Sequence, residues 1–174
     1  MKKNIDSRYL AYLLRHHPEE ANLHLDKNGW CDVDELLSAL DLYQDELDDI
    51  VYSNTRFVYN ENKTKIKAAH GHSVKVSYQN AAVPPNVLYH GTSRDLIPAI
   101  RRGGLKKMNR DAVHLSERYD TAVAVGARHT GGRGDRLVIY KVKAFEMHLA
   151  GYKFYKSEDG VWLTDSVPPE YLYI

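Results

Sequence analysis

Nine histidines stand out in this sequence, and several lie in short blocks beside arginine, lysine or serine. The first block, LLRHHP, places Arg15, His16 and His17 at the end of an apolar segment. An arginine can donate two parallel hydrogen bonds to a phosphate, and a neighbouring histidine can add a third. The block is therefore a candidate anion site. The alternative is simple capping, because cations are favoured at the C-terminus of a helix.

A second block, KIKAAHGHS, contains three basic side chains: Lys67, His70 and His72. If residues 64–69 form a strand, alternate side chains lie on one face. Gly71 permits a tight turn, so we expect His72 and Ser73 to be free to cap or to bind. The alternative is a solvated edge strand that its lysines protect from aggregation.

Three further blocks follow in the second half: LYHGTS (His90, Gly91, Thr92), VHLS (His114, Ser116) and VGARHTGG (Arg128, His129). A strand that ends in His-Gly-Thr-Ser just before a helix suits a ligand mouth, where a glycine permits close backbone approach. Plain helix capping by Ser93 explains the same residues equally well. His114 and Ser116 are expected on one face of a strand.

Several classes of site lack support. Cys31 is the single cysteine, which excludes an intramolecular disulfide and CxxC-type sites. HExxH is absent, and His-His or His-Gly-His is too generic to define a zinc site, so we expect no metal. The GxSxG, GxxxxGK[ST] and GxGxxG motifs are missing too, which disfavours a serine hydrolase, a P-loop and a Rossmann-type NAD site.

Charge is unevenly distributed although the net value is only +1. Residues 1–83 carry 10 Lys/Arg and 13 Asp/Glu, whereas residues 84–174 carry 14 and 10. Basic residues gather in RRGGLKKMNR (101–110), which is either solvated surface or a face for a polyanion such as RNA. No apolar run approaches the roughly 20 residues that span a bilayer, and no signal peptide is evident, so we expect a cytoplasmic protein, most simply a monomer.

The first half predicts helices and a hairpin. Helices are expected over 6–16, from Asp32 with Glu35 as a capping-box-like start, and over 44–53. RFVYN and TKIKAAH flank a polar turn at residues 61–63, which indicates a β-hairpin. Three helices and a hairpin predict a winged-helix-like lobe over residues 1–76.

A polar, proline-bearing linker is expected over 77–86, and the second half, 87–174, then reads as short strands. The expected strands are VLYH (87–90), AVHLS (112–116), RLVIYKV (136–142), YKFYK (152–156) and GVWLT (160–164), with helices over 95–102 and 118–127. Pro98 is tolerable only within the first turn of its helix. The fold class is α+β.

Taken in order, the blocks resemble the RNA 2′-phosphotransferase family, best known from the end of tRNA splicing. The resemblance runs from about residue 7 to residue 173 and rests on LLRHHP, DKNGWCDVDELL, RFVY, IKAAHGHS, LYHGTS, VHLS, VGARH and GVWLT. Each block is weak alone, but their ordered combination is highly specific.

This resemblance implies a winged-helix lobe that engages RNA, followed by an ADP-ribosyltransferase-like lobe that binds NAD⁺ on a split β-sheet. It also implies an RNA-processing transferase with two steps. The RNA 2′-phosphate first attacks the nicotinamide-bearing ribose carbon of NAD⁺ and expels nicotinamide. The 2″-hydroxyl of the attached ADP-ribose then attacks the phosphorus, which releases RNA with a 2′-OH and ADP-ribose 1″,2″-cyclic phosphate.

The family pattern also implies two sets of site residues. A basic catalytic quartet around the phosphate falls on Arg15, His16, Lys67 and Arg128. The NAD⁺ pocket falls on His90, Gly91, Thr92, His114 and Ser116. A phosphate dianion is already a nucleophile, so the first step needs positioning and charge screening more than a general base.

Three positions depart from related patterns. Lys67 stands where the family has arginine, which keeps the charge and loses the planar fork, and His70 stands where glutamine is usual. Val161 stands where many protein-modifying ADP-ribosyltransferases carry glutamate. An apolar residue there fits an acceptor that is already anionic, unless Val161 and Trp162 are simply core strand residues.

Two other functions stay open. One is an ADP-ribosyltransferase that stops after the first step and caps nucleic-acid phosphate ends. The other is a non-catalytic RNA-binding module, whose RNA affinity would not depend on Arg128 or NAD⁺.

Overall fold

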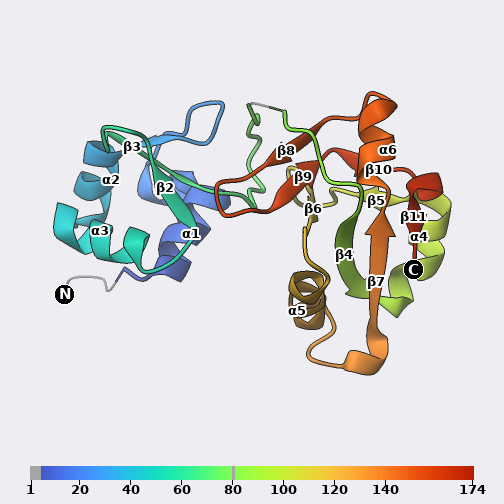
Figure 1. Ribbon diagram of the computed structural model, residues 1–174. Coiled ribbons are helices and arrows are strands. Elements are labelled where there is room, and N and C mark those ends of the chain that lie inside the picture. Colours follow the sequence, from blue (N-terminus) through green and yellow to red (C-terminus); the bar gives the residue numbers. More distant parts are fainter. Residues whose placement is uncertain (1–4, 80) are drawn as a thin grey trace. The chain divides into compact units, whose positions relative to one another are not determined.

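The computed structural model describes residues 5–79 and 81–174, which form two compact units (Figure 1). Unit 1 takes in the chain up to Gln79 together with Asn109–Asp111, and unit 2 takes in the remainder. Each unit has its own apolar core. Helices are mixed with small antiparallel sheets, so the fold class is α+β, as predicted. None of the helices described is both long and apolar enough to cross a membrane.

Unit 1 contains three α-helices, one 3₁₀ turn and one small sheet. They are α1 (Ser7–Arg15), η1 (Pro18–Ala21), β1 (Cys31–Asp32), α2 (Val33–Leu40), α3 (Gln44–Tyr52), β2 (Phe57–Tyr59) and β3 (Lys65–Ala68). The three predicted helices and the predicted hairpin are therefore confirmed to within two residues at each end.

The helices begin where their capping residues stand. Asp6 accepts hydrogen bonds from the backbone N–H groups of Arg8 and Tyr9 at 3.1 and 2.8 Å, and Asp32 accepts one from Glu35 N–H at 3.0 Å. The Glu35 carboxylate accepts instead from the backbone and ring of His24, so the predicted capping box is only half formed. These caps satisfy N–H groups that a helix leaves unpaired at its start.

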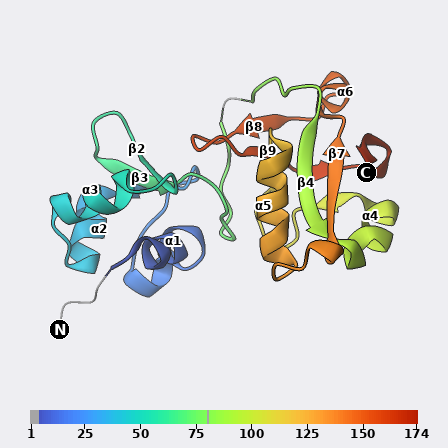
Figure 2. The same ribbon diagram turned by 60° about the horizontal axis from the view of Figure 1, so that its bottom comes forward.

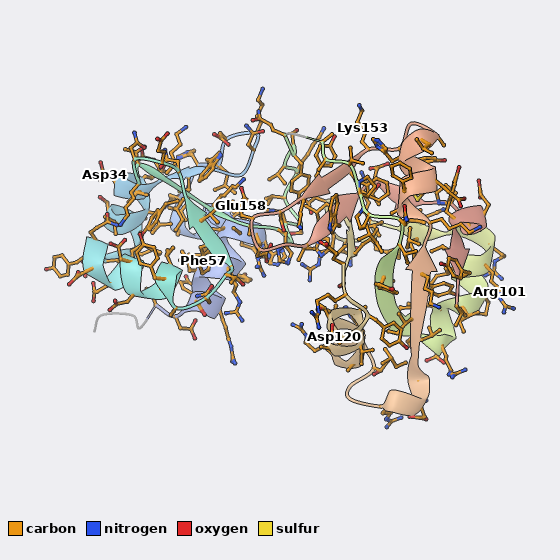
Figure 3. All side chains as sticks on the ribbon, in the orientation of Figure 1. Asp34, Phe57, Arg101, Asp120, Lys153 and Glu158 are labelled. Carbon is orange, nitrogen blue, oxygen red and sulfur yellow. The ribbon has the colours of Figure 1, made fainter. Side chains whose placement is uncertain are left out.

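The sheet of unit 1 has the strand order β1-β3-β2, with β3 in the middle. Ile66 pairs with Cys31 on one side and with Tyr59 on the other. The alternative interpretation, in which residues 64–69 form an edge strand that its lysines protect from aggregation, is therefore wrong. Phe57, labelled in Figure 3, is buried in the core of this unit together with Ile66.

Unit 2 is built from short strands and three α-helices. The strands are β4 (Leu88–Ser93), β5 (Leu105–Lys106), β6 (Val113–Leu115), β7 (Leu137–Val142), β8 (Phe154–Lys156), β9 (Trp162–Thr164), β10 (Ser166–Val167) and β11 (Leu172–Tyr173). The helical segments are η2 (Arg94–Leu96), α4 (Ile97–Gly103), α5 (Tyr119–His129), η3 (Gly134–Arg136), α6 (Ala144–Leu149) and η4 (Pro169–Tyr171).

Two antiparallel three-stranded sheets carry most of unit 2. Their orders are β11-β7-β4 and β6-β9-β8, and a two-stranded sheet pairs β5 with β10. Tyr89 and Ser116 join β4 to the end of β6 through an isolated bridge, in which each N–H donates to the other's carbonyl at 2.8 Å. All five predicted strands and both predicted helices of this half are present, whereas β5, β10, β11 and α6 were not predicted.

Two residues singled out in the sequence have clear places in this unit. Pro98 lies in the first turn of α4, the only part of a helix interior that tolerates it. Trp162 is a buried residue of β9, while Val161 is half-buried just before that strand and pairs through its backbone with Ser157.

Helix α5 lies directly against β4, as Figure 2 shows. A Cβ added to Gly91 would lie 2.1 Å from the carbonyl oxygen of Ala122 and 3.0 Å from Cα of Gly126. Gly91 therefore permits the close approach of a helix within the protein, and this packing is a structural reason for glycine at this position. Asp120, labelled in Figure 3, lies in the first turn of the same helix.

Gly91→Ala is expected to destabilise unit 2 because its methyl group collides with the backbone of α5. Overpacking of this kind costs about 1–3 kcal/mol, which thermal unfolding would measure as a lowered midpoint. Gly134→Ala is the matched control, because nothing lies within 4 Å of its added Cβ and its φ is not positive. Equal midpoints for the two variants would contradict the close packing of α5 on β4.

Candidate active site

The segment after β3 is tied to the end of α1 by backbone hydrogen bonds. The carbonyl oxygen of Arg15 accepts from the N–H groups of Ser73 and Val74, at 2.8 and 3.3 Å. Gly71 makes the preceding turn with φ +86°, as the sequence predicts. These contacts bring the LLRHHP and KIKAAHGHS blocks together within unit 1.

The imidazole of His16 faces this segment. Its Nδ1 lies 2.8 Å from the hydroxyl oxygen of Ser73. Burial lowers the pKa of His16, and the nearby guanidinium groups of Arg110 and Arg15 lower it further. His16 is therefore favoured as the neutral base near pH 7. Its side chain bonds to Ser73 rather than capping α1, although its position is that of the C-cap residue.

His72 is fully buried, with an exposed fraction of 1%, so the expectation that it is free to bind is wrong. Its ring packs on Gly29, where an added Cβ would lie 3.1 Å from Nε2. Its Nδ1 lies 3.8 Å from the Asp111 carboxylate, whose side chain is also buried. Ser73, the other residue expected to be free, is exposed and contacts His16.

Burial also lowers the pKa of His72 to about 4, with further lowering by the positive charges of surrounding residues. Those residues are Arg15, His70, Lys67 and His16. His72 is therefore uncharged near neutral pH. His72 therefore lies among basic residues that come from two separate blocks of the sequence, LLRHHP and KIKAAHGHS.

Lys67 extends from β3 toward the ring of Trp30, and its Nζ lies 4.7 Å from the ring centroid. A cation at this distance is attracted by the ring's negative face. The contact helps to fix the direction of a long, flexible side chain, which loses less entropy on binding an anion when it is already ordered.

Three residues that sequence reasoning did not assign to a site complete this part of unit 1. Arg110 donates from Nη1 to the carbonyl oxygen of Gly71 at 2.9 Å, and Asp111 N–H donates to His72 O at 3.0 Å. The hydroxyl of Tyr78 donates to the Asp111 carboxylate. Burial raises the pKa of Asp111, partly offset by this bond. The signal available in the sequence was the basic run that ends at Arg110.

In unit 2, His90 and His114 lie on facing strands. His90 Nδ1 lies 3.0 Å from the carbonyl oxygen of His114, and a carbonyl only accepts, so Nδ1 carries the proton. Burial lowers the pKa of His90, and this bond opposes the shift only in part. His90 is therefore a neutral imidazole whose Nε2 is the acceptor nitrogen.

The other predicted residues of unit 2 surround this pair or lie on α5. Thr92 is buried on β4 at 5% exposure, and Ser116 follows β6 and holds Tyr89. Ser93 bonds to Asp95 instead of capping η2, so the plain capping interpretation is wrong. Arg128 is exposed in the last turn of α5.

Unit 1 thus brings together Arg15, His16 and Lys67, whereas Arg128 and the predicted NAD⁺-pocket residues belong to unit 2. In residues 5–79 and 81–174, no group of three or more His, Cys, Asp or Glu side chains is placed to hold a metal ion. The chemistry available is that of several cations and three neutral imidazoles, those of His16, His72 and His90.

Comparison with known proteins connects this arrangement to one family. Residues 2–166 match the model of the RNA 2′-phosphotransferase family, Tpt1/KptA. A relative from Flavobacterium johnsoniae, named as a probable RNA 2′-phosphotransferase, is 45% identical over 95% of this chain and 93% of its own length. Relatives with the same name from Trichormus variabilis and Fusobacterium nucleatum are 45% and 42% identical, over 97% and 95% of this chain and 94% of their own lengths.

The buried, neutral state of His72 predicts a pH-dependent stability of unit 1. Its pKa is about 4 in the folded state and 6.5 ordinarily, so the unfolded chain binds more protons between these values. The free energy of unfolding should therefore fall as the pH drops from 6.5 to 4, by up to about 3 kcal/mol.

Denaturant unfolding of Trp162→Phe, in which Trp30 is the only tryptophan, would report on unit 1 through fluorescence. Adding His72→Gln should flatten the dependence between pH 4 and 6.5. Asp111 has a raised pKa, which by itself would make the free energy of unfolding rise as the pH falls. Because both proteins retain Asp111, this contribution is largely common to them. Parallel pH profiles for the two proteins would contradict a buried neutral His72.

Proposed function

The chain belongs to the RNA 2′-phosphotransferase family and is a transferase that removes a 2′-phosphate from RNA; we propose that it does so in two steps with NAD⁺ as co-substrate. The observation that carries this proposal is the contact of Arg15 and His16 with the segment 71–74, where Lys67 from β3 also acts electrostatically on the buried His72. Like charges held close together favour a dianionic ligand, because binding it replaces repulsion with attraction.

In the proposed first step, a 2′-phosphate oxygen forms a bond to the nicotinamide-bearing ribose carbon. The bond from that carbon to the nicotinamide nitrogen breaks, and its electron pair leaves with nicotinamide. The phosphate needs no general base, so the basic residues of unit 1 serve to position it and to screen its charge. Arg15 offers a planar fork and Lys67 a point charge.

In the proposed second step, the 2″-hydroxyl attacks phosphorus and the bond from phosphorus to the RNA 2′-oxygen breaks. Negative charge gathers on the phosphoryl oxygens, which the same cations stabilise. The attacking hydroxyl must lose a proton and the leaving 2′-oxygen must gain one. His16 is suited to carry this proton because its lowered pKa favours the neutral, accepting form, and Ser73 orients its ring.

The proposed NAD⁺ pocket consists of His90, Gly91, Thr92, His114 and Ser116 in unit 2. A neutral His90 with its proton fixed on Nδ1 presents an acceptor at Nε2, which suits a ribose hydroxyl or an amide N–H. No Rossmann-type glycine motif is required, because the pocket would be made by the sheets around the Tyr89–Ser116 bridge.

We further propose that unit 1 is a winged-helix lobe that engages RNA and that unit 2 is an ADP-ribosyltransferase-like lobe. Three helices packed with the sheet β1-β3-β2 support the first assignment. Two three-stranded sheets joined by a single bridge support the second, since a split sheet needs this kind of junction. The predicted linker, 77–86, spans the point where unit 1 gives way to unit 2.

An RNA oligonucleotide with one internal 2′-phosphate tests the reaction. With NAD⁺, we expect equal amounts of 2′-OH RNA, nicotinamide and ADP-ribose 1″,2″-cyclic phosphate; without NAD⁺, we expect no change in the RNA. Chromatography with mass detection resolves these three products from the 2′-phosphorylated RNA and from NAD⁺. A stable ADP-ribosylated RNA without cyclic phosphate would favour an enzyme that stops after step one. Absence of any NAD⁺-dependent product would refute the proposal.

Arg128→Ala is expected to lower the turnover rate roughly 100-fold, the usual loss when a group that stabilises developing charge is removed. Arg118→Ala is a matched control, because Arg118 caps the opposite end of α5 and pairs with Asp120 in solvent. Single-turnover rates would separate the two. If Arg128→Ala retains the wild-type rate, Arg128 is not part of the catalytic set.

A further inference from the structure

Two guanidinium groups meet at Gly71 in unit 1. The position that a Cβ of Gly71 would occupy lies 2.8 Å from Nη1 of Arg110 and 3.6 Å from both Cζ and Nε of Arg15. Arg110 reaches this position from a different part of the chain and holds the Gly71 carbonyl oxygen at 2.9 Å. Glycine is favoured here by its φ of +86°, and the absence of a side chain lets the end of Arg110 lie close to the backbone.

No salt bridge within the described residues neutralises Arg110. The neighbouring carboxylate, Asp111, accepts a hydrogen bond from Tyr78 and faces His72, and the side chains of Asp111 and His72 are both buried. Arg110 itself is exposed as a residue, and a guanidinium has five N–H donors, of which one bonds to Gly71. Two guanidinium groups held close together repel one another unless an anion lies between or beside them.

We propose that Arg110 is a phosphate-binding residue that contacts the 2′-phosphate monoester of the RNA together with Arg15. This inference rests on the proposed function and adds a residue to the phosphate end of its site. Both guanidinium groups would donate to the same phosphate, each through a planar fork.

Arg110 also supplies a planar fork of N–H donors, which Lys67 lacks. Lysine offers a point charge without a fork, and its Nζ is drawn to the ring of Trp30. With Arg110 included, unit 1 contains two planar guanidinium groups near Gly71, those of Arg15 and Arg110. The backbone bond from Asp111 N–H to His72 O and the contact of Tyr78 with Asp111 fix the segment that carries Arg110.

Binding measured without NAD⁺ isolates this contact from catalysis. Two RNA oligonucleotides are used, identical except that one bears an internal 2′-phosphate. Arg110→Gln removes the charge and keeps a shorter side chain that can still donate hydrogen bonds. Arg8→Gln removes one exposed charge from α1 of the same unit and serves as the control.

Arg110→Gln should weaken binding of the 2′-phosphorylated RNA roughly 10- to 100-fold, the loss expected for hydrogen bonds to a charged group, and leave the unphosphorylated RNA almost unchanged. Arg110→Lys should fall between wild type and Arg110→Gln for the phosphorylated RNA. Arg8→Gln should not discriminate between the two RNAs. Equal weakening of both RNAs by Arg110→Gln would place Arg110 on the phosphodiester backbone and overturn the proposal, as would wild-type affinity.

A second readout separates a direct role from a structural one. In the free protein, Arg110→Gln should raise the pKa of His16 toward its ordinary value, as measured by NMR of the imidazole ring, because one nearby charge is gone. Arg8→Gln should leave that pKa unchanged. A loss of the His16–Ser73 contact in Arg110→Gln would instead assign Arg110 to holding the loop and overturn the proposal. Failure of NAD⁺-dependent turnover in wild type would refute the proposed reaction without altering these binding results.

Discussion

The meeting of two guanidinium groups at Gly71, beside a histidine on which Lys67 also acts electrostatically, is the interaction that this part of unit 1 must hold in place. Arg15, Lys67 and Arg110 come from α1, β3 and the segment 109–111, and neutral imidazoles stand among them. Repulsion between such groups must be offset by other contacts in the folded protein. Backbone atoms supply them: the carbonyl oxygens of Arg15, Gly71 and His72 all accept hydrogen bonds that fix this region. Backbone hydrogen bonds thus hold this part of unit 1 in place.

One buried histidine in each unit, His72 in unit 1 and His90 in unit 2, shows how burial selects a protonation state. His72 and His90 both have lowered pKa values, chiefly because charging a buried imidazole is costly. His72 contributes shape and neutrality among cations. His90, with its tautomer fixed by the His114 carbonyl, presents one acceptor. A neutral ring at His72 avoids adding charge where cations already gather.

Much of the fold could be predicted from local sequence patterns. Apolar spacing and capping residues located α1, α2 and α3, and β-branched runs located the longer strands. The strands β5, β10 and β11 have two residues each, too short for any periodicity, and α6 has only six. Their existence depends on partners distant in sequence. The burial of His72 is likewise non-local, because it follows from packing on Gly29 and Asp111.

The candidate site could likewise be predicted from the sequence in part. Residue types and order pointed to Arg15, His16 and Lys67, and the structure brings these three together. Arg110 escaped the prediction because nothing local distinguishes it from the other basic residues of 101–110. Only the return of the chain to unit 1 at Asn109–Asp111 places it beside Gly71. Gly91 was predicted to permit the close approach of a ligand to the backbone, whereas in the structure the helix α5 makes that approach.

Mapping by NMR tests most directly whether the segment around Gly71 receives the 2′-phosphate. A short RNA with an internal 2′-phosphate is titrated into the full chain without NAD⁺, and the same RNA without that phosphate serves as the reference. We expect the amide signals of Gly71 and Ser73 to shift only with the phosphorylated RNA, and the pKa of His16 to rise as the dianion binds. Identical shifts with both RNAs, or an unchanged His16 pKa, would contradict it.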